Sequence, residues 1–127
     1  MKLEHFALNV PDPKAQAAWY VEHLGMRMVV DLDDPPYLTF VADEAGAVIE
    51  MYHNDKFPIP DYNDVHPTTF HIAFNAEDIE AEKERLLAAG ASDTGIVMEL
   101  AGARFCFVRD PWGVPLQLLK RPKPLLS

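Results

Sequence analysis

Hydrophobic and polar positions alternate over residues 3–10 and again over 69–75, as expected for strands that bury one face. The two segments are related, because HFALN at residues 5–9 recurs as HIAFN at residues 71–75, at an offset of 66. VIEM at residues 48–51 has a further counterpart in PLQL at residues 115–118, at an offset of 67. Agreement of several positions at nearly one offset indicates two structurally equivalent modules.

The first module has clear signals for one helix. Asp12 is a suitable N-cap, Pro13 suits the first helical turn, and Gly25 suits the end of the helix after Leu24. Three short strands are expected to follow, because turn residues divide the rest of the module into segments at about 26–31, 37–42 and 47–52.

The second module repeats this order. A helix is expected between Asp78 and Gly90, followed by strands at about 95–99, 103–109 and 115–120. We therefore predict a single α+β domain over residues 1–127, built from two tandem βαβββ modules. Module 1 spans about 1–53, a proline-containing linker spans about 54–67, and module 2 spans about 68–127.

Alternation along the strands separates two kinds of side chain. The large apolar sets are expected to pack beneath the helices: Phe6, Leu8 and Val10 in the first strand, and Phe70, Ile72 and Phe74 in the fifth. The opposite faces carry a polar, small, polar series, which suits a cavity wall better than a core. His5, Glu50, His71 and Gln117 all stand on these opposite faces. If the modules pair about an approximate twofold axis, the four side chains converge on one point.

Two imidazoles, one carboxylate and one amide oxygen form a plausible site for one divalent metal ion. The donor types suit Zn, Ni, Co, Mn or Fe. Such an ion would act as a Lewis acid with room for substrate oxygens, because no thiolate is available to close the site. The alternative is that each histidine is a hydrogen-bonded residue on a half-exposed sheet face.

Five further residues are candidates for contact with a substrate, and each has a structural alternative. Asn9 and Asn75 point toward the same face as the histidines, or form hydrogen bonds at strand ends. Tyr52 shares the face of Glu50, or lies at the edge of the core. Trp112 lies at the rim of the site, or rests on its own hairpin. Arg104 meets an anionic substrate, or is solvated or ion-paired.

The composition of the chain limits the kinds of partner that it is expected to bind. The chain has 127 residues, with 11 Lys and Arg against 20 Asp and Glu and a net charge of -9, which disfavours nucleic acid and anionic membranes as partners. The single cysteine, Cys106, excludes an intramolecular disulfide and lies in an apolar run typical of a buried thiol. No apolar stretch approaches the ~18 residues of a membrane span, and the N-terminus lacks an apolar signal segment. We expect a soluble, cytoplasmic protein with a small-molecule substrate.

Two segments resemble one known superfamily. HFALNVPDP at residues 5–13, continuing to Trp19-Tyr20 and to LGM at 24–26, is similar to the opening of the vicinal oxygen chelate superfamily. FCFVRDPWGVPLQL at residues 105–118 resembles its closing motif. The superfamily includes glyoxalase I, fosfomycin and bleomycin resistance proteins, methylmalonyl-CoA epimerase and extradiol dioxygenases, and the likeness covers nearly the whole chain.

This resemblance implies a curved mixed sheet around a metal cleft, with the helices on the outer face and a homodimer as the assembly. It implies His5, Glu50, His71 and Gln117 as the metal ligands. In such enzymes the metal chelates adjacent substrate oxygens, and a neighbouring carboxylate moves the proton.

One departure from the family pattern separates two hypotheses. Gln117 stands where glyoxalase-like members usually place a glutamate, and an amide oxygen can ligate a metal but cannot act as a general base. Glu50 is then the carboxylate available for proton transfer. The first hypothesis is a metal-dependent lyase or isomerase of the glyoxalase type, acting on a small oxygenated metabolite. The alternative is a metal-free small-molecule binding protein of the bleomycin-resistance type.

Overall fold

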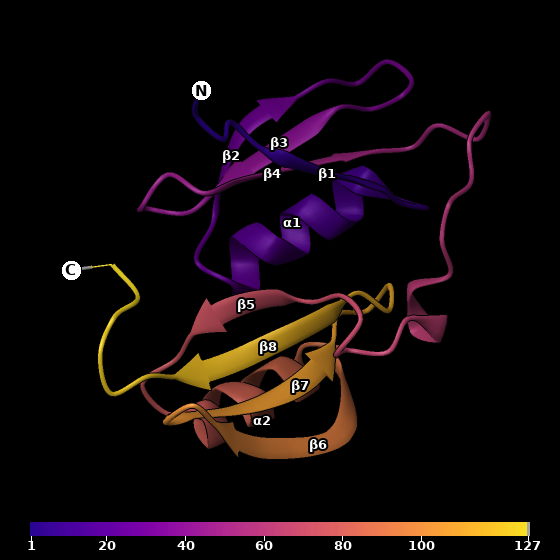
Figure 1. The fold of residues 1–127 in the computed structure, drawn as a ribbon. Coiled ribbons are helices and arrows are strands. Elements are labelled where there is room, and N and C mark those ends of the chain that lie inside the picture. The colour runs from indigo at the N-terminus through magenta and orange to yellow at the C-terminus, as the bar shows by residue number, and fades with distance from the viewer. Residues whose placement is uncertain (127) are drawn as a thin grey trace. The chain divides into compact units, whose positions relative to one another are not determined.

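The computed structural model describes residues 1–126. The order strand, helix, strand, strand, strand occurs twice along these residues, as the repeat predicted (Figure 1). The first module comprises β1 (Phe6–Asn9), α1 (Pro13–His23), β2 (Arg27–Asp31), β3 (Thr39–Ala42) and β4 (Val48–Tyr52). The second comprises β5 (Ile72–Asn75), α2 (Ile79–Ala88), β6 (Ser92–Leu100), β7 (Ala103–Arg109) and β8 (Pro115–Lys120). A single turn of 3-10 helix, Tyr62–Asp64, lies in the segment that joins them.

Each module has its own four-stranded mixed sheet. The strand orders are β1-β4-β3-β2 and β5-β8-β7-β6. In both sheets the first strand of the module pairs in parallel with the last, and the other pairs are antiparallel. The predicted α+β class with tandem βαβββ modules is thereby confirmed. The chain divides into two compact units after Pro60, a residue inside the predicted linker.

The helices begin where their capping residues predicted. The side chain of Asp12 accepts a hydrogen bond from the amide of Ala15, and that of Asp78 accepts one from the amide of Ala81. Each bond satisfies an amide that has no partner within its helix, which stabilises the helix by about 1 kcal/mol. At 11 and 10 residues, α1 and α2 are too short to cross a bilayer, and no helix in residues 1–126 is long and apolar enough to do so.

Three strands, β1, β5 and β6, begin three residues away from their predicted starts. β6 begins at Ser92, three residues before the predicted start, because the ladder with β7 continues past an irregularity between Asp93 and Val97. Gly95, which has a φ of 75°, lies in that irregularity. In a sequence, a glycine at such a position is a typical signal for the end of a strand. β1 is shorter than the predicted 3–10, because its pairing with β4 starts at Phe6.

The apolar core of each module lies between its helix and one face of its sheet. In module 1, α1 packs against β2, β3 and β4, and the buried residues include Tyr20, Val41, Ile49 and Met51. In module 2, α2 packs against β7 and β8, and the buried residues include Leu86, Val108, Leu116 and Leu118. Burial of such side chains contributes roughly 1.5–3 kcal/mol each.

Phe6 is an exception to the predicted core. It was expected beneath a helix with Leu8 and Val10, but 38% of its surface is exposed, whereas Leu8 and Val10 are buried. β1 is the edge strand of its sheet, and α1 packs mainly over β2, β3 and β4, which leaves the start of β1 uncovered.

The predicted burial of Cys106 is confirmed. The thiol is free and only 2% exposed. Burial is the main cause that raises the pKa of Cys106, and the nearby ammonium of Lys83 lowers it by a smaller amount. The thiol therefore stays protonated at neutral pH, which makes it a poor nucleophile.

Candidate functional site

The first module brings His5 and Glu50 together. His5 immediately precedes β1 and Glu50 is the central residue of β4, which pairs in parallel with β1. The Nε2 atom of His5 lies 3.4 Å from Oε2 of Glu50, and the exposed fractions of these side chains are 32% and 15%. Two ligands bound to one ion at about 2.1 Å are separated by roughly 3.0–3.4 Å when the angle between them is 90–109°. The pair therefore has the spacing of two ligands of one ion.

A second carboxylate orients the ring of His5. Oε1 of Glu4 lies 2.9 Å from Nδ1 of His5, so this nitrogen donates its hydrogen to the carboxylate. A neutral ring with hydrogen on Nδ1 has its lone pair on Nε2, the nitrogen that faces Glu50. Two electron-pair donors then face each other, an arrangement that a cation between them stabilises. Glu4 was not among the predicted residues, since the repeat offers no counterpart to it.

The second module places His71 and Gln117 in equivalent positions. His71 immediately precedes β5, and Gln117 lies in β8, which pairs in parallel with β5. The register aligns Ala73 with Gln117, as it aligns Ala7 with Glu50 in module 1. A small, exposed side chain therefore lies beside each oxygen donor and leaves space in front of it.

A backbone carbonyl fixes the ring of His71. Nδ1 of His71 lies 2.7 Å from the carbonyl oxygen of Pro67. A carbonyl can only accept, so Nδ1 carries the hydrogen and Nε2 of the neutral ring keeps its lone pair. Hydrogen bonds of this kind orient metal-ligating histidines in proteins. Each module thus holds one imidazole with Nε2 available for a metal.

Both imidazoles rest on a phenylalanine at the same place in the repeat. The ring centroids of His5 and Phe40 are 5.4 Å apart with an interplanar angle of 78°, and those of His71 and Phe107 are 5.1 Å apart with an angle of 59°. Phe40 is aligned with Glu50 in the β3–β4 ladder, and Phe107 with Gln117 in the β7–β8 ladder. The sequence prediction missed these supports, although their separation of 67 positions repeats the offset of the oxygen donors.

The face of the second sheet that carries Gln117 is more apolar than predicted. Phe105 and Phe107 pack edge to face, with centroids 5.6 Å apart. They form a buried cluster with Ala103 and Leu119, against which Ile96 packs. The expected polar and small series holds along β5, but β7 and the end of β8 provide an apolar floor beside Gln117.

The structure gives Asn9 a structural role. Its side-chain NH₂ donates to the carbonyls of Asn54 at 2.9 Å and Pro58 at 3.2 Å, and its oxygen accepts from the amide of Asn54 at 2.9 Å. Asn9 therefore anchors the chain that follows β4, which is the strand-end alternative of the sequence analysis. Its repeat counterpart, Asn75, is exposed at the end of β5.

Tyr52 and Trp112 are both half-buried. Tyr52 ends β4 and is aligned with Asn9 in the β1–β4 ladder. Trp112 lies in the turn between β7 and β8, where its backbone amide donates to the buried carboxylate of Asp110 at 2.9 Å. The same carboxylate accepts from the amide of Val114, also at 2.9 Å, and thereby fixes the turn that leads into β8.

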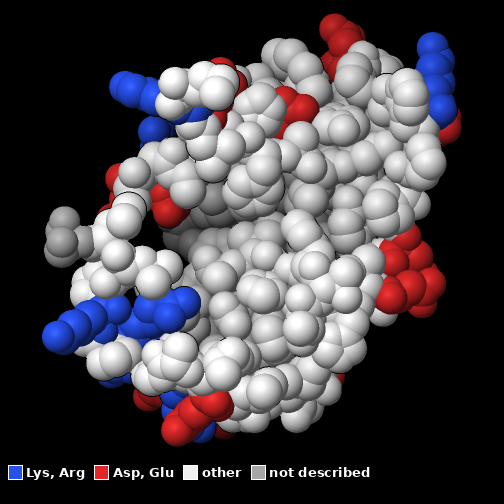
Figure 2. Space-filling view, in the orientation of Figure 1, with Lys and Arg blue, Asp and Glu red and all other residues white. Residues whose placement is uncertain are grey.

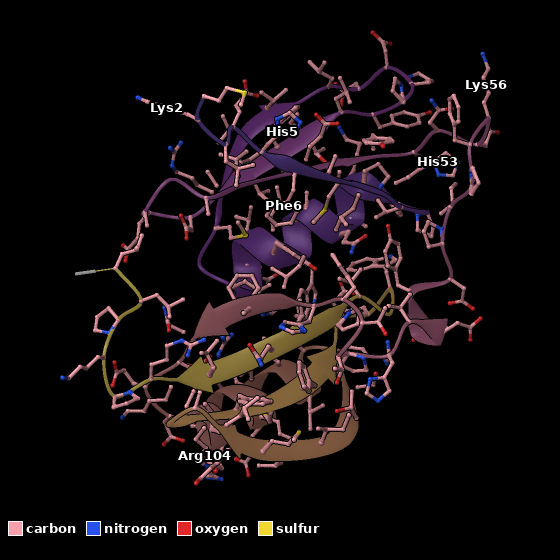
Figure 3. All side chains as sticks on the ribbon, viewed as in Figure 1. Lys2, His5, Phe6, His53, Lys56 and Arg104 are labelled. Carbon is pink, nitrogen blue, oxygen red and sulfur yellow. The ribbon has the colours of Figure 1, made fainter. Side chains whose placement is uncertain are left out.

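Arg104 lies on the sheet face opposite Gln117. In the β7–β8 ladder it alternates with Phe105 and Phe107, so it projects from the face of the sheet opposite Gln117. Its guanidinium forms an ion pair with Glu80 of α2, and Figure 3 shows Arg104 near the start of β7, at the bottom of the view. The ion-paired alternative thus describes Arg104, and the proposed site does not include it.

Within residues 1–126, no group of three or more His, Cys, Asp or Glu side chains is placed to share a metal ion. Within module 1, His5 and Glu50 lie together, and within module 2, His71 and Gln117 lie on one sheet face. Figure 3 shows His5 and Phe6 on opposite sides of β1, so the imidazole projects away from the side chain that was expected in the core.

Comparison with known proteins identifies the family. The model of the Glyoxalase/Bleomycin resistance protein/Dioxygenase superfamily matches residues 2–118. The chain is 30% identical to a lactoylglutathione lyase of Haemophilus influenzae, over 94% of this chain and 93% of the relative. It is 33% identical to an ethylmalonyl-CoA/methylmalonyl-CoA epimerase of Cereibacter sphaeroides, over 74% of this chain and 75% of the relative.

Solved structures show the same fold. A glyoxalase family protein from Bacillus cereus superposes with a TM-score of 0.76 at 16% identity, over 94% of this chain and 93% of that one. An antibiotic binding protein from a Streptomyces species superposes with a TM-score of 0.69 at 19% identity, over 97% of each chain. The chain belongs to the Glyoxalase/Bleomycin resistance protein/Dioxygenase superfamily.

Proposed function

We propose that this protein is a metal-dependent lyase or isomerase that acts on a small oxygenated metabolite. His5, Glu50, His71 and Gln117 would ligate one divalent ion, with Zn, Ni, Co, Mn and Fe as the candidates. The observation that carries the proposal is the 3.4 Å separation between Nε2 of His5 and Oε2 of Glu50. The hydrogen bond from Nδ1 of His71 to Pro67 adds support, because it leaves Nε2 of the second imidazole available.

The four donors suit an open site for a metal ion that is intermediate between hard and soft. Two imidazoles, one carboxylate and one amide oxygen suit a first-row divalent ion and leave positions for substrate oxygens. When bound, the ion would supply Lewis acidity that polarises the substrate oxygens next to the reacting carbon.

Glu50 is the residue that would move the proton. It is the only carboxylate of the four candidate ligands, and Gln117 cannot titrate in its place. Its side chain is 15% exposed, and the aligned residue on β1 is Ala7, which leaves room for a substrate carbon beside the carboxylate. General-base catalysis of this kind contributes typically 10²–10⁴-fold to a rate. The names of the relatives agree with the reaction class, since one is a lyase and the other an epimerase.

A metal-free binding protein is the second candidate. The apolar character of the sheet face around Gln117 favours it, because pockets for small molecules are lined mainly by apolar and aromatic side chains. The replacement of a carboxylate by Gln117 also lowers the negative charge available to hold a cation.

Elemental analysis of protein purified without chelators separates the two candidates. We expect near-stoichiometric divalent metal, lost in His5→Ala and in His71→Ala. His23→Ala is the matched control, because His23 lies near the end of α1 and should leave the metal content unchanged. Protein that is empty and takes up no metal on dialysis would support the binding protein instead. A small panel of hemithioacetals, acyl-CoA thioesters and catechols then tests turnover.

A cytoplasmic location and a homodimer belong to the same proposal.

A further inference from the structure

The guanidinium of Arg109 donates to three main-chain carbonyls. Arg109 is the last residue of β7 and is half-buried. Its Nη1 atom donates to the carbonyl oxygens of Tyr62 and Val65, each at 2.9 Å, and of Gly113 at 3.1 Å. Most Lys and Arg side chains on the face shown in Figure 2 project from the surface. Arg109 instead holds the segment before β5 against the turn between β7 and β8.

The two segments that Arg109 joins are in close contact. Tyr62–Asp64 is a turn of 3-10 helix, and Tyr62 itself is buried. A Cβ atom on Gly113 would lie 2.6 Å from Cγ of Asn63, closer than a Cβ atom and a side-chain carbon can pack, and Gly113 has a φ of 94°. Only glycine therefore fits where the 3-10 turn meets the β7–β8 turn. Hydrogen bonds from a charged donor are roughly twice as strong as neutral ones, so Arg109 is a strong bond across this contact.

The segment that Arg109 holds leads directly to the acceptor of His71. Pro67 lies two residues after Val65, and its carbonyl accepts from Nδ1 of His71 at 2.7 Å. His66 closes the turn, because its carbonyl accepts from the amide three residues later at 2.8 Å. Pro67 is buried, and its ring fixes φ at about −65°. The place of this carbonyl therefore depends on where Arg109 holds Val65.

Arg109 also shares a sheet face with the support of the same ring. Arg109 and Phe107 alternate with Val108 along β7, so both project from the face that carries Gln117. The ring of Phe107 contacts that of His71, with centroids 5.1 Å apart. All of these residues belong to the compact unit that begins at residue 61. One strand thus supports the imidazole through Phe107 and, through Arg109, holds the segment that orients it.

The internal repeat shows that module 1 lacks this arrangement. The residue 67 positions before Arg109 is Ala42, and the same offset relates the two phenylalanines that support the imidazoles. Ala42 is buried, and its side chain has no hydrogen-bond donor. Module 1 instead orients His5 through the neighbouring carboxylate of Glu4. Arg109 therefore acts on the second imidazole alone.

We infer that Arg109 is a positioning residue for His71. By holding Val65 it places the carbonyl of Pro67, which keeps the hydrogen of the ring on Nδ1 and leaves Nε2 as the donor to a metal. Removal of such an outer partner typically lowers metal affinity 10- to 100-fold. The inference rests on the proposed function for the metal that Nε2 would bind. The position of the hydrogen on the ring is a property of the metal-free chain, so it can be measured separately.

Nuclear magnetic resonance of the metal-free full chain measures the ring directly. Long-range proton–nitrogen spectra at pH 8 report which ring nitrogen carries the hydrogen, and the His71 signals are assigned by their loss in His71→Gln. We expect wild type to carry the hydrogen on Nδ1. Arg109→Met keeps the length of the side chain without its donors, so the hydrogen should redistribute toward Nε2. Arg109→Lys keeps one charged group and should lie between the two, and the His5 signals should be the same in every variant.

Chelator competition measures metal affinity in the same set of variants. We expect Arg109→Met to weaken divalent-metal binding about 10- to 100-fold, with partial recovery in Arg109→Lys. Arg104→Ala is the matched control, because Arg104 is the other arginine of β7 but projects from the opposite face and pairs with Glu80. It should leave the His71 tautomer and the metal affinity unchanged.

Three outcomes decide the inference, once denaturant titration has established which variants are folded. It is overturned if the folded Arg109 variants keep the wild-type tautomer, whatever stability they lose, or if they lose no more metal affinity than Arg104→Ala. Should Arg109→Met fail to fold, the comparison of Arg109→Lys with wild type decides in the same way. A wild-type chain that binds no metal, but whose His71 tautomer changes in Arg109→Met, would contradict the proposed function and leave the positioning role of Arg109 standing.

Discussion

The imidazole of His5 faces the carboxylate of Glu50 at 3.4 Å, although 45 positions separate the two residues in the chain. Their parallel strands, β1 and β4, bring them together. The second module repeats the strand pairing but replaces the carboxylate with Gln117, and it fixes His71 through the carbonyl of Pro67. The two modules therefore place their histidines at the same position beside the sheet, and only the first module pairs its histidine with a titratable oxygen donor.

Replacing Glu50 with Gln tests its role as the base. Glutamine keeps an oxygen donor but cannot accept a proton, so turnover of whichever substrate the metal-loaded protein accepts should fall about 10²- to 10⁴-fold. Metal affinity should be partly retained, as measured by chelator competition. Glu4→Gln is the comparison, because Glu4 contacts only the other nitrogen of His5 and should affect metal affinity more than proton transfer. Turnover equal to wild type in Glu50→Gln would remove Glu50 from the mechanism.

Substitutions at Gln117 test whether its amide ligates the metal. A carboxylate at this position adds negative charge beside the ion, so Gln117→Glu should raise divalent-metal affinity about tenfold, equivalent to about 1.4 kcal/mol. Gln117→Leu removes the donor at similar size and should lower the affinity. Competition titration against a chromogenic chelator measures both changes. If Gln117→Leu binds metal as wild type does, the amide is not a ligand.

Two phenylalanine variants separate the support of His71 from general packing. Phe105 and Phe107 are 7% and 3% exposed and share one cluster, so Phe105→Leu and Phe107→Leu should each lower the free energy of unfolding by about 1–2 kcal/mol. Only Phe107 contacts the ring of His71, so only Phe107→Leu should also weaken metal binding. Denaturant titration gives the stability and chelator competition the affinity. Equal metal affinity in the two variants would show that the ring contact does not position His71.

The raised pKa of the buried Cys106 thiol predicts how the free energy of unfolding depends on pH. Burial raises its pKa in the folded state, so over the alkaline range the unfolded chain loses the thiol proton first. The contribution of Cys106 to stability is therefore complete below the ordinary thiol pKa and declines as pH rises above it. Cys106→Ala should lack this decline when denaturant midpoints are compared across pH.

Labelling of the same thiol provides an independent measurement. At pH 8 the folded protein should react with a disulfide reagent far more slowly than the protein in guanidinium chloride, because the thiol is 2% exposed and protonated. Rapid reaction of the folded chain would show that Cys106 is accessible.

Much of the fold could be predicted because its signals are local and occur twice. Asp12 and Asp78 act as N-caps through amides three residues away, so no distant contact is needed to recognise them. Strand alternation correctly assigned Glu50 to the face opposite Ile49 and Met51, because each strand buries one of its two faces. The prediction started β6 at about residue 95 and missed Ser92 to Thr94, which precede the irregularity in the β6–β7 ladder or lie within it.

Contacts between distant segments decided the roles that the pattern left open. Asn9 and Asn75 occupy equivalent positions in the repeat, yet Asn9 alone of the two forms side-chain hydrogen bonds within the described residues, because the chain after β4 returns over it. Arg104 shares its strand with residues of the site but projects toward α2, where Glu80 pairs with it. Neither outcome depends on residue type alone, since each partner comes from a segment that only folding brings near.

The amino-acid sequence by itself determined the duplicated βαβββ order, the helix ends and the four polar residues on the faces opposite the core. These follow from periodicity and capping, which act over a few residues. Only the tertiary structure decided that Phe40 and Phe107 support the imidazoles and that Nδ1 of His71 is held by Pro67. Ring packing and hydrogen-bond direction depend on the register between strands and on where the connecting segments cross them, and no local pattern encodes either.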